Sequence, residues 1–225
     1  MRHLVTRSVA VLLAAGAAIT AQAAHLDNPN LLGDPSFEDP ASLTADGPPF
    51  VGSYETFSLD GDQATGGDTV LHDTTMPRTG SGAVEIAIGS VENSFAGLFQ
   101  DASFPSSLAG TQAWFSGWHK LQGNTGGTEA RIEWRDSVND VEISRTPNLT
   151  TSPAGSDYEE FIVSDTIPAG ADTARLVYAI QSFGGVQDQT IFLDDVNFNI
   201  SGYVPEPSAA MLALLGLAPL TRRRR

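Results

Sequence analysis

The sequence contains no cysteine, so disulfide bonds, thiolate metal sites and thiol catalysis are all excluded. It also lacks a Gly-x-Ser-x-Gly elbow, a His-Glu-x-x-His motif and a phosphate-binding loop. We therefore predict no catalytic residue. The stability of the fold has to come from burial of apolar surface, to which a bound metal ion could add.

Basic residues are scarce, with 12 Lys and Arg against 27 Asp and Glu. Half of the basic residues lie at the two ends, so residues 24–203 carry 26 acidic and 6 basic residues, a net charge near −20. Phosphate contacts need Lys and Arg, which excludes nucleic acid as a partner, and anionic lipid surfaces should repel this segment. Its carboxylates offer oxygen ligands for divalent cations, although most are expected to be solvated.

Long apolar runs are missing as well. The N-terminal run spans positions 9–19, which is too short to cross a bilayer as a helix. It follows a basic start and precedes Ala21-Gln22-Ala23, the small-x-small pattern that signal peptidase accepts. We predict a signal peptide over residues 1–23, cleaved after Ala23, rather than a membrane anchor.

The last 22 residues combine three features. Pro205 and Pro207 flank Glu206 and hold the backbone extended, and an apolar run follows at positions 209–220. Four arginines end the chain: Arg222, Arg223, Arg224 and Arg225. A helix of 12 residues covers roughly 18 Å against a hydrocarbon core of about 30 Å. Transient membrane contact is therefore favoured over a permanent anchor, with a short C-terminal core helix as the alternative.

This tail resembles the PEP-CTERM sorting signal of bacterial surface proteins. The resemblance implies cleavage by an exosortase-type membrane protease near Pro205-Glu206-Pro207, with loss of the tail. We expect three parts, a signal peptide (1–23), one soluble domain (24–203) and a sorting tail (204–225). The product would be exported to the cell surface or an extracellular matrix, with signal peptidase and the exosortase-type protease as partners during export.

Helical periodicity is almost absent between the two ends. Short runs with period-two alternation are separated by Gly, Pro, Asp, Asn and Ser. We predict ten strands, at Leu31-Leu32, Tyr54–Leu59, Ala83–Ile88, Ala96–Phe104, Gln112–Leu121, Ala130–Trp134, Val141–Arg145, Tyr158–Val163, Thr173–Ser182 and Thr190–Ile200. This pattern is typical of an all-β fold, an antiparallel two-sheet β-sandwich or jelly roll.

Alternation also assigns side chains to faces. Three apolar residues of one strand share a face, and charged residues share the other: Ala130, Ile132 and Trp134 against Arg131, Glu133 and Arg135. In the last strand one face should hold Phe192, Asp194, Val196 and Phe198. Asp194 would then lie among core residues, where a carboxylate has to be paired, protonated or bound to a metal.

Four segments resemble the jelly-roll carbohydrate-binding modules of the cellulose- and xylan-binding type: Asn30–Leu32 with Ser36–Glu38, Thr79–Val84, Trp114–Lys120 and Ile191–Val196. The resemblance implies a galactose-binding-like sandwich whose first and last strands hold a structural calcium ion. The matching side chains are Glu38 and Asp194, with Asp195 as an alternative, and carbonyls near Gly80 and Ser81 would complete the shell. Otherwise Glu38 is a solvated edge residue and Asp194 caps a backbone amide.

Sugar binding needs aromatic faces for pyranose rings and polar groups beside them. The candidates are Trp114, Trp118, Lys120, Arg131, Glu133, Tyr54 and Tyr158. Trp114, Trp118 and Lys120 share one face of a central strand, and Arg131 and Glu133 would form the polar floor of a neighbouring strand. Core packing is the alternative for each tryptophan, because alternation does not show which face looks inward.

We therefore expect an exported, non-enzymatic surface or matrix protein with a carbohydrate-binding-like domain and a polysaccharide ligand. One alternative is a structural or adhesive matrix protein without a discrete sugar ligand. Another is a glycoside hydrolase that uses paired carboxylates. Adjacent acids such as Glu159-Glu160 and Asp194-Asp195 are expected by chance in so acidic a segment and carry little weight.

Overall fold

The computed structural model of the chain describes residues 27–44, 53–59, 67–89, 93–123, 127–150, 153, 156–182 and 188–205. The chain divides into one unit spanning Asn30–Ser201 and a second comprising Met1–Pro29 and Gly202–Arg225. Pro205 is described and exposed. The other predicted processing residues lie outside the described ranges: Ala21, Ala23, Glu206, Pro207, Arg222, Arg223, Arg224 and Arg225. No helix within those ranges is both long and apolar enough for a bilayer crossing.

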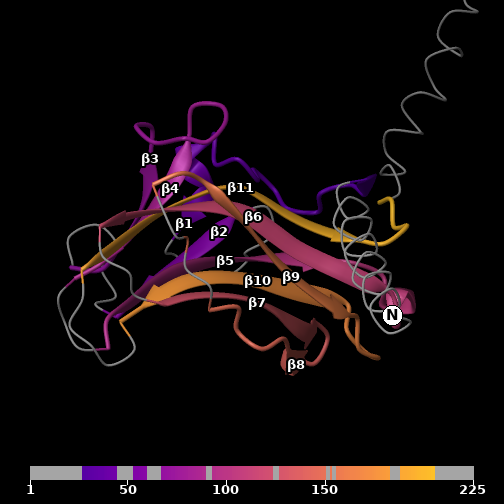
Figure 1. Cartoon of the computed structure of the whole chain (residues 1–225). Coiled ribbons are helices and arrows are strands. Elements are labelled where there is room, and N and C mark those ends of the chain that lie inside the picture. Colours follow the sequence, from indigo (N-terminus) through magenta and orange to yellow (C-terminus); the bar gives the residue numbers. More distant parts are fainter. Residues whose placement is uncertain are drawn as a thin grey trace, which may run out of the picture. The chain divides into compact units, whose positions relative to one another are not determined.

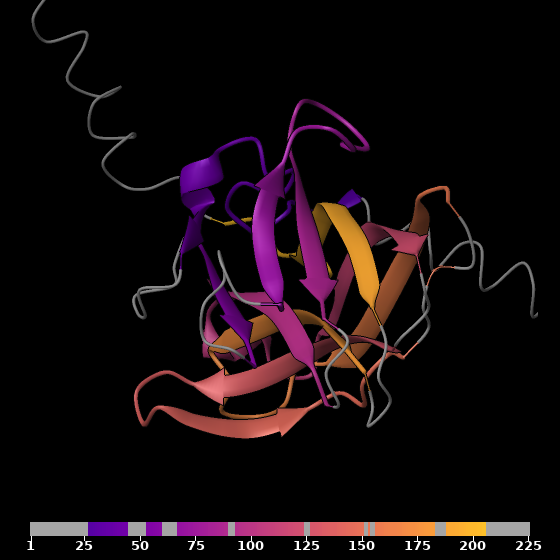
Figure 2. The same ribbon diagram turned by 90° about the vertical axis from the view of Figure 1, so that its left-hand side faces the viewer.

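The unit Asn30–Ser201 contains two stacked sheets (Figure 1). The six-stranded sheet has the spatial order β1 (Leu43–Thr44), β2 (Tyr54–Ser58), β5 (Phe95–Ser103), β10 (Thr173–Gln181), β7 (Gly127–Asp136) and β8 (Val141–Arg145). The five-stranded sheet has the order β3 (Thr69–Asp73), β4 (Ala83–Ile88), β11 (Gln189–Ile200), β6 (Gln112–Gly123) and β9 (Glu159–Thr166). Figure 2 shows β3, β4 and β11 side by side.

Antiparallel pairing dominates both sheets. Among the described strands, β1 and β2 are parallel and the other neighbouring pairs are antiparallel. Two short 3-10 turns, η2 (Pro40–Ser42) and η3 (Ser106–Leu108), precede β1 and β6. The predicted all-β, two-sheet antiparallel sandwich is therefore confirmed.

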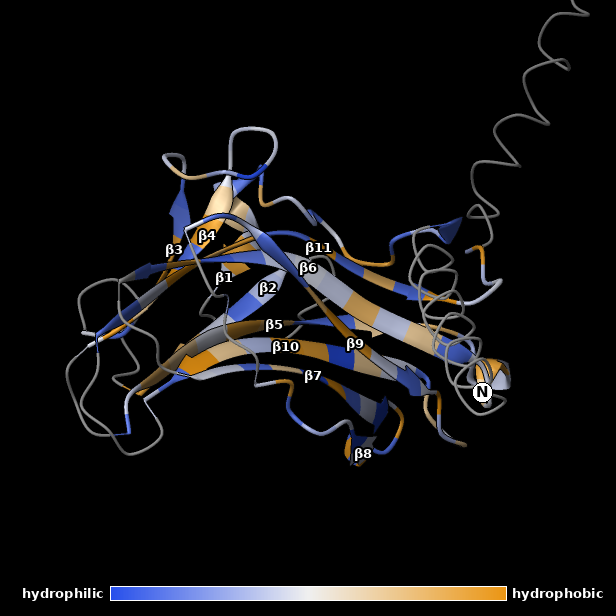
Figure 3. Cartoon of the chain, in the orientation of Figure 1, coloured by the Kyte–Doolittle hydropathy of each residue, from blue (hydrophilic) through white to orange (hydrophobic). Residues whose placement is uncertain are grey.

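The core lies between the sheets and follows from alternation. Bands of hydrophobic and hydrophilic residues succeed one another along β6 and β10 (Figure 3). The apolar side chains of β7 are buried, as predicted: Ala130, Ile132 and Trp134. Trp134 packs on Phe104 and Phe198 with ring centroids 6.0 and 6.3 Å away, and its Nε1 donates to Asp165 Oδ2 at 2.9 Å. This bond satisfies the polar edge of a large buried ring and links β7 to β9.

The last strand, β11, contains a β-bulge that alternation in the sequence does not reveal. Before the bulge, Asp194 lies opposite Trp118 of β6, on the outer face of the sheet. After it, Phe198 lies opposite Phe115, a buried residue of the core face. One extra residue moves all following side chains to the other face, and Asp195 within the bulge has a φ of 48°.

The prediction that Phe192, Asp194, Val196 and Phe198 share one face is therefore wrong. Phe192 and Asp194 lie on the outer face, whereas Val196 and Phe198 lie on the core face. Asp194 is nevertheless fully buried, because chain from outside the sheet covers it. Its burial was predicted, but for the wrong reason.

The strand predictions also need correction, and β1 was among the strands not predicted. Leu31-Leu32 is not a strand, although the Leu31 amide donates to the Phe198 carbonyl at 2.8 Å and so places this segment beside β11. Strand β3 was not predicted. It is an edge strand that mixes polar and apolar residues, and pairing with β4 on one side holds it in place.

One polar pair lies inside the sandwich. His119 of β6 and Tyr178 of β10 are buried, with His119 Nδ1 2.7 Å from the Tyr178 hydroxyl. The Phe161 ring packs on both, at 5.3 and 5.2 Å between centroids. Burial lowers the pKa of His119 to about 4, against the opposing charge of Glu159. The imidazole is therefore neutral at pH 7.

This pair predicts acid sensitivity. Below the usual pKa of 6.5 the unfolded chain protonates His119 while the folded chain does not, so the free energy of unfolding falls as the pH drops from 6.5 to about 4. The loss due to this group reaches about 3 kcal/mol. Chemical denaturation across this range should show a shallower pH dependence in His119→Gln than in the parent. Identical slopes would contradict the prediction.

Candidate functional site

Most of the predicted metal- and sugar-binding residues lie at the outer faces of the two sheets, whereas Tyr54 lies in the core. Most of them gather around residues 74–82, called the β3–β4 turn below: Glu38, Gly80, Ser81, Trp118, Lys120, Tyr158, Asp194 and Asp195. Arg131 and Glu133 lie on β7, in the other sheet. The prediction that these two residues form the floor of a strand beside β6 is therefore wrong.

Trp118 faces outward, but Arg78 of the β3–β4 turn covers it. The guanidinium carbon of Arg78 lies 3.7 Å from the Trp118 ring centroid, and its Nη1 is 2.5 Å from Asp195 Oδ2. A cation over an indole face contributes about 0.5–1 kcal/mol at a partly exposed site. Trp114 shares this outer face four residues along β6. One face of the Trp118 ring is thus already occupied by the chain itself.

Lys120 and Tyr158 contact the β3–β4 turn at Met76. The Tyr158 hydroxyl donates to the Met76 carbonyl at 2.6 Å, and Lys120 Nζ lies 3.8 Å from Met76 Sδ. Burial, together with nearby carboxylates, raises the pKa of Tyr158 and keeps the phenol neutral. These predicted sugar-binding residues therefore fasten the β3–β4 turn to the five-stranded sheet.

Asp194 is the buried polar centre of this region. Its Oδ2 accepts the Arg78 and Thr79 amides at 2.7 and 3.1 Å, and Oδ1 accepts the Asp195 amide at 2.7 Å. Burial raises the pKa of Asp194, and these amides oppose the rise. Burial also opposes ionisation of Asp195, but hydrogen bonds from Thr79, Ser36 and Arg78 lower its pKa. Backbone amides, hydroxyl groups and the Arg78 guanidinium thus satisfy both carboxylates.

Glu38 is engaged by the other end of the turn. Its Oε2 accepts the Ser81 hydroxyl at 2.6 Å and its Oε1 accepts the Ser81 amide at 3.0 Å. These hydrogen bonds lower the pKa of Glu38. Gly80 has a φ of 60°, and a Cβ at this position would lie 1.9 Å from Glu38 Oε1. A glycine is therefore required where the carboxylate approaches the turn.

These residues do not present the oxygen shell that calcium needs. Calcium takes six to eight oxygens at about 2.3–2.6 Å, whereas the carboxylates of Glu38, Asp194 and Asp195 face N–H and O–H donors. Within the described ranges, no group of three or more His, Asp or Glu side chains is placed to hold a metal. The arrangement does not fit calcium, and calcium binding stays a prediction from the resemblance.

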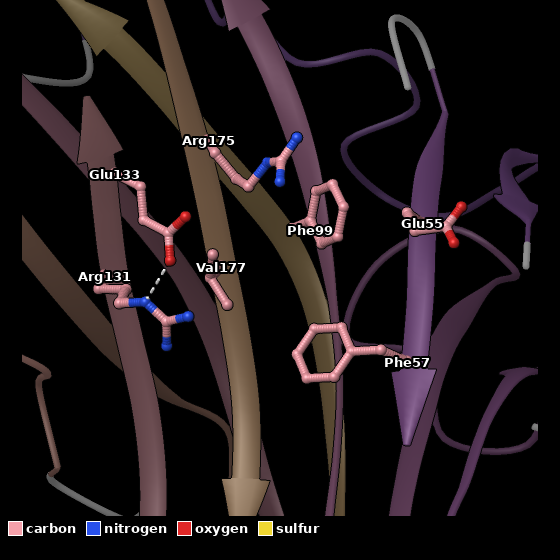
Figure 4. A pocket seen from close by; sticks show the side chains of 7 residues that line it. All are labelled: Glu55, Phe57, Phe99, Arg131, Glu133, Arg175 and Val177. Carbon is pink, nitrogen blue, oxygen red and sulfur yellow. Dashed lines mark hydrogen bonds and ion pairs between the residues drawn. The ribbon is translucent and has the colours of Figure 1, made fainter. Parts of the chain in front are cut away.

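A hollow of about 350 Å³ lies on the outer face of the six-stranded sheet (Figure 4). It is lined by Glu55, Phe57, Phe99, Arg131, Glu133, Arg175 and Val177. They come from β2, β5, β10 and β7, which are neighbours in the sheet. The register places Glu55, Phe99, Val177 and Arg131 in one row across the four strands. Because successive side chains of a strand point to opposite faces, the side chains of this row point away from the core.

Two aromatic rings form the apolar part of the hollow. The ring centroids of Phe57 and Phe99 are 6.4 Å apart, with an angle of 34° between the planes. Both residues are half-buried. The Phe57 ring lies over Gly97, where an added Cβ would be 2.7 Å from Phe57 Cζ. Gly97 therefore leaves the space that the Phe57 ring occupies.

Ionic pairs form the polar part. Arg131 Nε lies 2.7 Å from Glu133 Oε1, as the dashed line in Figure 4 marks. Arg175 donates Nε and Nη2 to the two oxygens of Asp101, at 2.8 and 3.0 Å. Its guanidinium carbon lies 4.1 Å from the Phe99 ring centroid. These contacts hold guanidinium and carboxylate groups in fixed directions beside the half-buried Phe57 and Phe99 rings.

The sequence located this hollow only in part. It singled out Arg131 and Glu133, but it missed the other lining residues, Glu55, Phe57, Phe99, Arg175 and Val177. Tyr54 was predicted to bind sugar, which is wrong: it is 2% exposed and packs against Phe37 at 4.8 Å. The alternation along β2 could have located part of the hollow, because Glu55 and Phe57 point to the opposite side of the strand from Tyr54.

Solved structures with a similar fold include carbohydrate-binding modules. A candidate sugar-binding protein from Bacteroides thetaiotaomicron VPI-5482 aligns with a TM-score of 0.50 and 10% identity over 76% of this chain and 100% of that one. The CBM22-1 xylan-binding domain of a Paenibacillus barcinonensis protein aligns with a TM-score of 0.46 and 14% identity over 79% and 97%. The likeness to the Bacteroides thetaiotaomicron structure shows the fold alone.

A third structure belongs to a much longer protein. The enzymatically active domain of tailspike protein 4 from bacteriophage CBA120 aligns with a TM-score of 0.48 and 18% identity over 66% of this chain. This chain spans only 19% of that one. No protein-family model and no curated protein sequence matches the chain.

The hydrogen bonds of the β3–β4 turn predict how the protein responds to calcium. Because donors already satisfy Glu38, Asp194 and Asp195, we expect the same melting temperature with a chelator and with added calcium. A ligand that binds only the folded state would raise it. Scanning calorimetry with Glu38→Gln as the matched variant provides the measurement. Calcium-dependent stabilisation of the parent that Glu38→Gln abolishes would contradict the expectation and restore the calcium site.

Proposed function

We propose that the protein binds carbohydrate in the hollow of the six-stranded sheet. The observation that carries the proposal is the placement of the Phe57 and Phe99 rings beside fixed ionic pairs on one outward face. A sugar ring has an apolar C–H face and a rim of hydroxyl groups. The phenylalanine rings match the face, and the guanidinium and carboxylate groups match the rim.

Preorganisation supports this assignment. The side chain of Glu133 is 7% exposed and Arg131 holds it in place, so little rotamer freedom remains to be lost when a hydroxyl binds. Hydrogen bonds to charged groups contribute about 1.5–3 kcal/mol each. The negative charge of residues 24–203 disfavours polyanionic polysaccharides, so a neutral glycan is the better match.

The position of the carboxylates favours binding over hydrolysis. Glycoside hydrolases hold two carboxyl groups about 5–10 Å apart. Glu55 and Glu133 are the two acids that line the hollow, and they lie on β2 and β7, three strand spacings or about 14 Å apart. Figure 4 shows Phe99 and Val177 between them. We therefore propose a non-enzymatic role.

The two ends of the chain are the basis for the proposed export and sorting of the protein. A signal peptide over residues 1–23 directs export, and the tail over residues 204–225 directs sorting by an exosortase-type protease. Together with the hollow, these segments make the protein an exported carbohydrate-binding component of the cell surface or extracellular matrix. The basis is the sequence pattern at the two ends.

Sugar binding is tested by affinity electrophoresis of the purified protein through gels that contain xylan, galactan or mixed-linkage glucan. We expect at least one of them to retard the parent. Phe57→Ala removes a stacking ring and should weaken the interaction about tenfold. Trp118→Ala is the matched control on the other sheet, and its mobility should equal that of the parent.

Two results would contradict this assignment. Loss of retardation in Trp118→Ala but not in Phe57→Ala would move the site to the five-stranded sheet. A parent protein that none of the polysaccharides retards would favour the structural or adhesive alternative. Melting temperatures of both variants show whether they are folded.

Export is tested by expression in a bacterial host with signal peptidase. Mass spectrometry of the protein outside the cytoplasm should show a mature chain that begins at Ala24. Ala23→Leu should block this cleavage because signal peptidase needs a small residue there. Ala14→Leu, within the apolar run, should be cleaved normally. Accumulation of the uncleaved parent in the cytosol would overturn this part of the proposal.

A further inference from the structure

A third phenylalanine lies beyond the hollow, in line with its aromatic part. Phe95 and Phe99 are both on β5, and Phe57 of the neighbouring strand β2 lies between them. The ring centroids are 6.3 Å apart for Phe57 and Phe95 and 6.4 Å apart for Phe57 and Phe99. Three rings therefore form a row along the strand, of which the hollow includes only two.

The row belongs to the outer face throughout. Burial along β5 alternates, with Phe95, Phe99 and Asp101 half-buried while Ala96 and Leu98 are buried. Gly97 lies between Phe95 and Phe99 and pairs with Ala179 of β10. Because Gly97 and Ala179 have little or no side chain, they leave space on the sheet surface beside the rings.

The two ends of the row differ in polarity. At the hollow end, the Arg175 guanidinium covers one face of Phe99 and is paired with Asp101. At the other end, Phe95 lies opposite Gln181, a neutral side chain. Phe99 lies four positions after Phe95 on the strand, which corresponds to about 13 Å. This length exceeds a single sugar ring.

We infer that the binding site continues along β5 to Phe95 and holds several consecutive units of a glycan chain. Phe95 stacks on a sugar unit that lies outside the hollow, and Phe57 stacks on the unit within it. The ligand is then a chain of several sugar units rather than a monosaccharide. This inference rests on the proposed function and adds Phe95 as a residue that determines the required chain length.

Isothermal titration with xylose and galactose sugars tests it, using the monosaccharide and the hexasaccharide of each. The parent should bind a hexasaccharide at least tenfold more tightly than the matching monosaccharide. Phe95→Ala should lose about tenfold for the hexasaccharide and nothing for the monosaccharide. Phe57→Ala should weaken both. Leu71→Ala, exposed on the other sheet, should change neither.

A second variant separates stacking from packing. Phe95→Leu keeps an apolar side chain that protects the sheet, but it lacks a ring, so it should show the same chain-length-dependent loss as Phe95→Ala. Hexasaccharide binding that neither Phe95 variant weakens, while Phe57→Ala still does, would overturn the inference and leave the proposed function intact. A parent that binds none of these sugars would overturn both.

Discussion

The structure depends on one geometric constraint: each sheet hides one face and exposes the other. With no disulfide in the chain, apolar side chains packed between the sheets hold the unit together. Residues that serve this packing, such as Trp134 and Phe198, alternate with residues that face outward. The core therefore decides which side chains remain for binding. The hollow is lined by side chains of β2, β5, β7 and β10 that do not take part in core packing and face outward.

The two outer faces are used differently. On the five-stranded sheet, Asp194 accepts amides from the β3–β4 turn and Arg78 lies over Trp118, so the chain covers its own aromatic surface. On the six-stranded sheet, the Phe57 and Phe99 rings line an open hollow, although the Arg175 guanidinium lies over Phe99 there as well. A buried carboxylate with three amide donors stabilises the first arrangement, and preformed ionic pairs stabilise the second.

The features that could be predicted from the sequence are those that depend on residues close together in the chain. Alternation and turn residues are properties of neighbours in the sequence, so most strands and the all-β class followed from them. The carboxylates near the β3–β4 turn were also identified, though their partners were not. The bulge at Asp194 and the edge strand β3 escaped because pairing with other strands creates them. Phe57 and Phe99 escaped because nothing local shows that β2 and β5 are neighbours.

The sequence by itself determined the absence of thiol chemistry, the strongly acidic surface, the export-like ends and the two-faced strands. Only the tertiary structure decided which face of each strand is covered and which strands lie side by side. Tyr54 became core and Phe57 became surface, although both belong to one short strand. The physical reason is that a period of two leaves two equivalent choices of face, and only long-range contact with the opposite sheet selects one.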